Sequence, residues 1–119
     1  MICVLICDDH QIVRQGIKQI LADASDLSLA GEAASGPEAI ARVRAGGIDV
    51  VLMDIAMPQR DGLDVLKQLR AEFPKLPVLM LSTYPDRQYA VRSLKLGAAG
   101  YLNKSADAEQ MTEAIRRVA

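Results

Sequence analysis

The chain has 119 residues, 14 of them Lys or Arg and 15 Asp or Glu, with a formal net charge of −1, which fits one domain without a basic surface for nucleic acid or membrane. Half of the residues are hydrophobic and only 3% are aromatic, so the core must be aliphatic. No apolar run has the length of a membrane span or of a signal-peptide core. We therefore expect a cytoplasmic protein with no membrane partner.

Apolar runs alternate along the chain with segments of helical periodicity. The first run, at residues 2–7, is continuously apolar and rich in β-branched residues, as is typical of a strand buried on both faces of a parallel sheet. From residue 11 onward, apolar side chains recur at helical spacing. The same alternation then repeats. The predicted strands are residues 2–7, 27–33, 48–53, 77–81 and 100–103, and the predicted helices are residues 11–23, 36–45, 62–73, 86–96 and 106–118.

Helix boundaries are marked by capping and breaking residues. Ser35 is placed to cap the second helix and Asp61 the third, while Pro74 stops the third and Gly97 closes the fourth. Parallel strands need crossover helices, and such crossovers are right-handed. The pattern therefore predicts a doubly wound α/β fold, in which five parallel strands carry helices on both faces.

Polar residues follow four of the predicted strands. Asp8 and Asp9 come after the first strand, Asp54 after the third, Ser82 after the fourth and Lys104 after the fifth. In open α/β sheets, ligands bind beyond the carboxyl ends of the strands. Three carboxylates, a hydroxyl and an ammonium are therefore expected to meet at one edge of the sheet. An Asp taken alone would also fit a helix cap, but caps do not explain the full set.

Three neighbouring carboxylates repel one another strongly unless a cation lies between them. Mg²⁺ prefers carboxylate oxygens and shares its shell with phosphate, and no set of histidines and cysteines competes for a softer metal. A carboxylate can also act as a nucleophile and carry an aspartyl phosphate. Phosphoryl transfer needs positioning and a cation on the developing charge, which Lys104 would supply, with Ser82 as a hydrogen-bond donor.

The motifs resemble the receiver domains of bacterial two-component response regulators over nearly the whole chain. The resemblance is carried by Asp8-Asp9, by residues 54–58 with Gly62, by Ser82-Thr83 and by residues 101–104. It implies the flavodoxin-like strand order 2-1-3-4-5. It also implies a switch that phosphorylates and dephosphorylates itself, rather than an enzyme that turns over a substrate.

The resemblance implies a role for each residue at the metal. Asp54 would be the phosphoacceptor and, with Asp8 and Asp9, would form the Mg²⁺ site. Asp9 would bind the ion directly and Asp8 through water. The backbone carbonyl of Ala56 would be a further metal ligand.

A second group of residues would detect the phosphoryl group. Lys104 would pair with it, the hydroxyl of Ser82 would move to meet it, and Tyr101 would be an aromatic rotamer switch coupled to Ser82. A sensor histidine kinase would be the phosphoryl donor. Phosphorylation would change the output surface and could bring two copies together as a homodimer.

A finer resemblance points to the NarL/FixJ branch of the family. It rests on residues 8–10, 13–16 and 100–105, and it implies control of a LuxR-type helix-turn-helix transcription factor. We expect residues 1–119 to be the receiver domain alone, with DNA contacted only through an output domain outside this chain. Ser105 replaces the proline that many receivers carry after the lysine, so no cis bond is expected there.

Three alternative functions are open. A phosphatase of the haloacid-dehalogenase type would place an Asp-x-Asp nucleophile motif after the first strand, where this chain has adjacent aspartates. A flavin or nucleotide binder would need a glycine-rich or hydroxyl-rich loop there. A phosphorylation-independent interaction domain would typically lack one of the polar residues. His10, the only histidine, is expected to face solvent at a helix start rather than to relay phosphoryl groups.

Overall fold

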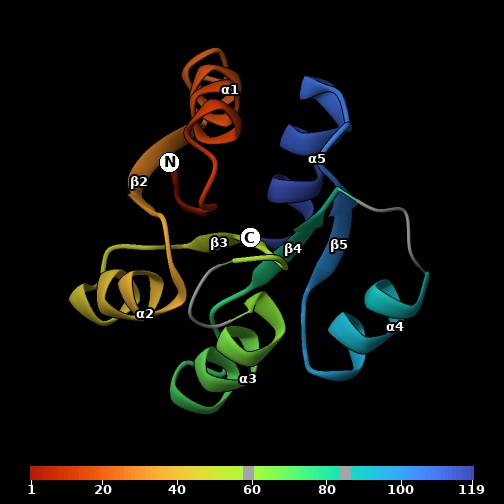
Figure 1. Cartoon of the computed structure of the whole chain (residues 1–119). Helices are drawn as coiled ribbons and strands as arrows, with labels where there is room; N and C mark the ends of the chain where they lie inside the picture. Colours follow the sequence, from red (N-terminus) through yellow and green to blue (C-terminus); the bar gives the residue numbers. More distant parts are fainter. Residues whose placement is uncertain (58–60, 84–86) are drawn as a thin grey trace.

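The computed structural model describes residues 1–57, 61–83 and 87–119, and within them it contains the predicted doubly wound sheet. The strands pair in parallel in the order β2-β1-β3-β4-β5, which confirms the expected topology (Figure 1). The strands are β1 (Ile2–Cys7), β2 (Leu27–Ala33), β3 (Val50–Asp54), β4 (Val78–Ser82) and β5 (Gly100–Asn103). The helices are α1 (Gln11–Ala22), α2 (Gly36–Ala45), α3 (Gly62–Glu72), α4 (Arg87–Lys95) and α5 (Ala108–Val118).

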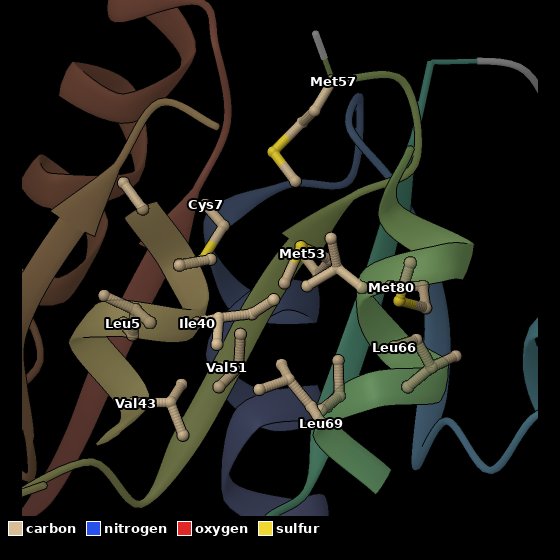
Figure 2. Packing of buried hydrophobic residues seen from close by; sticks show 14 of the residues in the cluster. Leu5, Cys7, Ile40, Val43, Val51, Met53, Met57, Leu66, Leu69 and Met80 are labelled. Atoms are coloured by element: carbon tan, nitrogen blue, oxygen red, sulfur yellow. The ribbon is translucent and has the colours of Figure 1, made fainter. Parts of the chain in front are cut away.

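Helices cover both faces of the sheet. Helices α1 and α5 lie on one face, and α2, α3 and α4 lie on the other (Figure 1). Because side chains alternate across a strand, neighbouring residues of β3 enter opposite cores. Val51 and Met53 pack with α2 and α3 (Figure 2), whereas Val50 and Leu52 pack with α1 and α5. The central strands are therefore buried on both faces, as their continuously apolar sequences predict.

Several predicted boundaries were wrong by one or two residues. The third strand begins at Val50 rather than at residue 48, because Asp49 bonds to the backbone of Cys3 through both its own N–H and its carboxylate. The fourth strand begins after Pro77, which has no N–H for the ladder. The last helix begins at Ala108, because the side chains of Asp107 and Gln110 form a reciprocal capping box. The predicted start of the fourth helix, at residue 86, lies outside the described residues.

The revised ends of the strands matter for the site. Asp54 belongs to β3 and pairs with Leu81, and Ser82 belongs to β4 and pairs with Asn103. Both side chains therefore project from ladder positions rather than from free loops. The expected caps of α2 and α3 are present, with Ser35 accepting from the Glu38 N–H and Asp61 from the Asp64 N–H.

Two further observations concern the backbone and the helices of the described residues. The described peptide bonds are trans, including the one before Ser105. Among the described helices, none combines the length and the apolar character that crossing a membrane requires.

Candidate functional site: an acidic pocket with a buried lysine

Two buried carboxylates face one ammonium group at the carboxyl edge of the sheet. Asp8 follows β1 and is 0% exposed, and Asp54 ends β3 and is 2% exposed. Lys104 follows β5, and its Nζ lies 2.6 Å from Oδ2 of Asp8 and 3.1 Å from Oδ2 of Asp54. The three residues come from three different strands, and the predicted meeting of carboxylates and ammonium is confirmed.

Backbone hydrogen bonds hold these residues in place. The N–H of Asp8 donates to the carbonyl of Ala33 at 3.0 Å, which continues the pairing of β1 with β2. The N–H of Lys104 donates to the carbonyl of Ser82 at 2.9 Å, which continues the pairing of β4 with β5. The site residues are therefore placed by extensions of the sheet, and such positions are more rigid than loop positions.

The loop that follows Asp54 returns close to its own strand. The N–H of Gly62 donates to the carbonyl of Ile55 at 2.6 Å, so the first turn of α3 rests against the end of β3. A Cβ atom on Gly62 would lie 2.1 Å from the carbonyl oxygen of Asp54. Only glycine fits at this position, because any side chain would collide with the backbone of Asp54.

Burial and charge shift the pKa values of the central pair. Burial, and then the charge of Asp8, raise the pKa of Asp54, while the ammonium of Lys104 opposes that rise. Burial alone would lower the pKa of Lys104, but the carboxylates of Asp8 and Asp54 outweigh it and raise the value. Lys104 is therefore held in its charged ammonium form. Additional positive charge near Asp54 would stabilise the ionised form of its carboxyl group.

The donor set suits a divalent cation. Asp8, Asp9, His10 and Asp54 each offer one ligand atom, and all four atoms lie within 4.8 Å of one another. The buried Oδ2 atoms of Asp8 and Asp54 accept no well-aligned hydrogen bond within the described residues, although Lys104 faces both. Three carboxylates fit the hard oxygen shell of Mg²⁺. Ala56 donates its N–H to Oδ1 of Asp54 at 3.3 Å, and the role of its carbonyl stays a prediction.

His10 adds a nitrogen atom to the candidate metal ligands. Its side chain is 64% exposed, as predicted for a residue at a helix start. Its ring does not cap α1, and its Nδ1 lies 3.2 Å from Oδ1 of Asp8 and 3.2 Å from Oδ1 of Asp9. The sequence predicts a donor set of oxygen atoms only. The structure adds one nitrogen.

Ser82 and Tyr101 lie on β4 and β5, the two strands that follow β3 across the sheet. Ser82 is buried at the end of β4, one strand from Asp54. Tyr101 lies on β5, half-buried, and packs against the core shared with α2 and α3. Their roles as switch hydroxyl and rotamer switch stay predictions.

Arg14 is a site residue that sequence reasoning missed. Its Nη1 donates to the carbonyl of Asp8 at 2.6 Å, and its Nε donates to Glu32 of β2 at 3.1 Å. Lys18 also pairs with Glu32, at 3.2 Å. Arg14 thereby ties α1, β2 and the acidic loop together. The only sequence signal is its place within residues 13–16, which carry the resemblance to the NarL/FixJ branch.

A doubly wound sheet of this strand order, with an acidic pocket and a lysine beyond β5, is the arrangement of a CheY-like receiver fold. The family model described as "Response regulator receiver domain" matches residues 4–116. The chain belongs to this family.

Curated relatives and solved structures agree with the family match. The chain is 41% identical over 118 residues to the response regulator GacA of Pseudomonas viridiflava, covering 99% of this chain and 55% of that protein. It is 38% identical over 118 residues to the response regulator UvrY of Escherichia coli O6:H1, covering 99% and 54%. The chain thus spans about half the length of these relatives.

The structural match is close. A chain from the CheX–CheY–BeF₃–Mg²⁺ complex of Borrelia burgdorferi superposes with a TM-score of 0.92 at 27% identity, covering 98% of this chain and 88% of that one. The similarity extends over the whole sheet and its helices.

Proposed function

We propose that this domain is a two-component signalling switch that accepts a phosphoryl group on Asp54 from a sensor histidine kinase, in a reaction that requires Mg²⁺. The observation that carries the proposal is the position of Lys104, whose ammonium lies between the buried carboxylates of Asp8 and Asp54. A buried cation beside a buried carboxylate that other elements hold in place is what phosphoryl transfer to an aspartate needs.

The reaction forms one bond and breaks another. A carboxylate oxygen of Asp54 attacks the phosphorus of the donor, and the bond from phosphorus to the nitrogen of the kinase histidine breaks. The ammonium of Lys104, now paired with Asp54, turns to an oxygen of the transferred group and stabilises its charge. Mg²⁺, held by Asp8, Asp9, Asp54 and the carbonyl of Ala56, would neutralise charge on the same oxygens. The Borrelia complex contains Mg²⁺ and BeF₃, which supports this assignment.

Phosphorylation changes the charge at Asp54 by about −1 relative to the carboxylate, because the phosphoryl group brings about −1.5 to −2. In this proposal Ser82 moves toward the new oxygens, and Tyr101 turns into the space between β5 and α4. The surface formed by α4, β5 and α5 would then shift between two populations. A homodimer on phosphorylation would use the shifted surface.

We infer that the switch controls a LuxR-type helix-turn-helix transcription factor, as the resemblance of residues 8–10, 13–16 and 100–105 to the NarL/FixJ branch implies. DNA would be contacted only through such an output domain. The domain would act as a cytoplasmic signalling switch that also hydrolyses its own aspartyl phosphate.

Asp54→Asn tests the proposal. We expect the wild-type domain, incubated with Mg²⁺ and acetyl phosphate, to gain one phosphoryl group by intact-mass analysis. Asp54→Asn should gain none, since an amide is not a nucleophile for phosphorus. Asp64→Asn, on the first turn of α3, is the matched control and should react like the wild type. Equal phosphate gain in the wild type and Asp54→Asn would refute the assignment.

A further inference from the structure

We propose that His10 makes the acidic pocket a site for first-row transition metal ions, which it binds through Nδ1 together with the carboxylates of Asp8 and Asp9. This inference rests on the proposed metal site and extends it, because it names a nitrogen ligand and a second class of ion. It predicts that Ni²⁺ or Zn²⁺ gains affinity from His10, whereas Mg²⁺ does not.

The spacing of the three donor atoms carries the inference. His10 Nδ1 lies 3.2 Å from Oδ1 of Asp8 and 3.2 Å from Oδ1 of Asp9. In an octahedral site with bonds of about 2.1 Å, neighbouring ligand atoms are about 3.0 Å apart and opposite ones about 4.2 Å apart. Each of the two oxygens therefore already lies at about the distance of a neighbouring ligand from the nitrogen. The four candidate ligand atoms, including that of Asp54, all lie within 4.8 Å of one another, which is close to the distance between opposite ligands.

A metal ion would bind these atoms more fully than a single proton does. An Nδ1 atom carries at most one proton, and it faces two carboxylate oxygens at the same distance. Without a metal, that proton is shared between the two oxygens, and Oδ1 of Asp8 also accepts from the backbone N–H of His10 at 2.8 Å. A cation in its place would be bonded to all three atoms, because neutral imidazole and both carboxylates would each donate a lone pair.

Lys104 leaves this side of the pocket open. Its ammonium contacts Oδ2 of Asp8, whereas His10 contacts Oδ1 of the same carboxylate. Asp8, buried and 0% exposed, thus presents one oxygen to the ammonium and the other toward His10 and Asp9. A metal ion on the Oδ1 side need not displace Lys104.

Ligand chemistry selects the class of ion. Imidazole suits Zn²⁺, Ni²⁺, Cu²⁺ and Fe²⁺, and affinity for such sites rises along the first row of transition metals, whereas Mg²⁺ keeps oxygen and water. The ring of His10 is mostly exposed, so an ion can reach it from solvent.

Metal titrations of the tag-free domain test the inference. We expect His10→Ala to weaken Ni²⁺ and Zn²⁺ binding by about tenfold or more and to leave Mg²⁺ affinity nearly unchanged. His10→Asn, which keeps a donor oxygen at a similar place, should retain Mg²⁺ affinity and lose the preference for Ni²⁺. Because the chain has a single histidine, the imidazole nitrogen signals are unambiguous in an NMR spectrum, and Zn²⁺ should shift Nδ1.

The outcomes separate the two proposals. If Zn²⁺ and Mg²⁺ both bind and His10→Ala binds them as well as the wild type does, the role of His10 is refuted and the Mg²⁺ site stands. An unmoved Nδ1 signal at saturating Zn²⁺ would refute it in the same way. If neither ion binds, the proposed metal site itself fails, and the inference fails with it.

Discussion

Gly62→Ala should destabilise the domain by about 3 kcal/mol or more, above the usual cost of an overpacked site. The added Cβ would lie 2.1 Å from the carbonyl oxygen of Asp54 and 2.9 Å from Cα of Ile55. Both atoms are backbone, so no flexible side chain can turn aside. The first turn of α3 would have to move away from the end of β3, and the hydrogen bond from Gly62 to Ile55 would lengthen.

The same substitution should also weaken the site. Because the clash is with Asp54 itself, the phosphoacceptor candidate would move relative to Asp8 and Lys104. Metal-dependent phosphorylation should fall even where the variant is still folded. Urea unfolding measures the change in the free energy of unfolding, provided that the variant and the wild type have equal m-values.

Gly16→Ala is the matched control. Gly16 lies in α1, is exposed, and a Cβ there would meet no atom within 4 Å. Alanine in a helix interior is favoured over glycine by about 1 kcal/mol, so this variant should gain stability. If both variants changed stability in the same direction and by similar amounts, the contact with Asp54 would not be the cause.

Lys104→Met should cost about 3–5 kcal/mol at neutral pH without divalent ions, because it leaves two buried carboxylates without their cation. Methionine keeps most of the length and apolar volume of the lysine stem, so the loss reports on charge. The pKa of Asp54 is already raised by burial and by Asp8, and loss of the ammonium would raise it further. A carboxyl whose pKa is raised in the folded state destabilises the fold above that pKa.

The stability of Lys104→Met should depend on pH in a defined direction. Lowering the pH through the raised pKa of Asp54 protonates it in the folded state, so Lys104→Met should recover stability as the pH falls from neutral. Adding Mg²⁺ should recover stability at neutral pH. Thermal unfolding over a pH series, with and without Mg²⁺, measures both effects.

A double variant isolates the electrostatic cause. Lys104→Met combined with Asp54→Asn leaves a single buried carboxylate, so it should be more stable than Lys104→Met alone. Asp54→Asn by itself should change stability little, since burial already disfavours its charge. If the losses of the two single variants simply add, the three groups do not interact and the description of the pocket is wrong.

The polar residues of the site could be predicted because parallel strands share a carboxyl edge. Asp8, Asp54 and Lys104 follow the first, third and fifth predicted strands, and any parallel pairing of these strands brings such residues to one side. The small errors at Val50 and Ala108 arose where side chains, rather than hydrophobic pattern, decide the boundary. Asp49 bonds back to Cys3, and Asp107 forms its capping box with Gln110.

Contacts between distant segments could not be predicted in this way. Arg14 reaches the carbonyl of Asp8 and the carboxylate of Glu32 at once, which depends on how α1 lies across β1 and β2. The approach of His10 to two carboxylates depends on the rotamers of three adjacent side chains. Neither distance follows from residue spacing.

Local hydrophobic periodicity and chain order are enough to predict the alternation of strands and helices and the residues that end the strands at the site. Which oxygen of Asp8 faces Lys104 and which faces His10 can be known only from the folded structure. The same is true of the need for glycine at position 62. These are matters of a few ångströms between separate elements, and they depend on strand register and side-chain packing across the whole sheet.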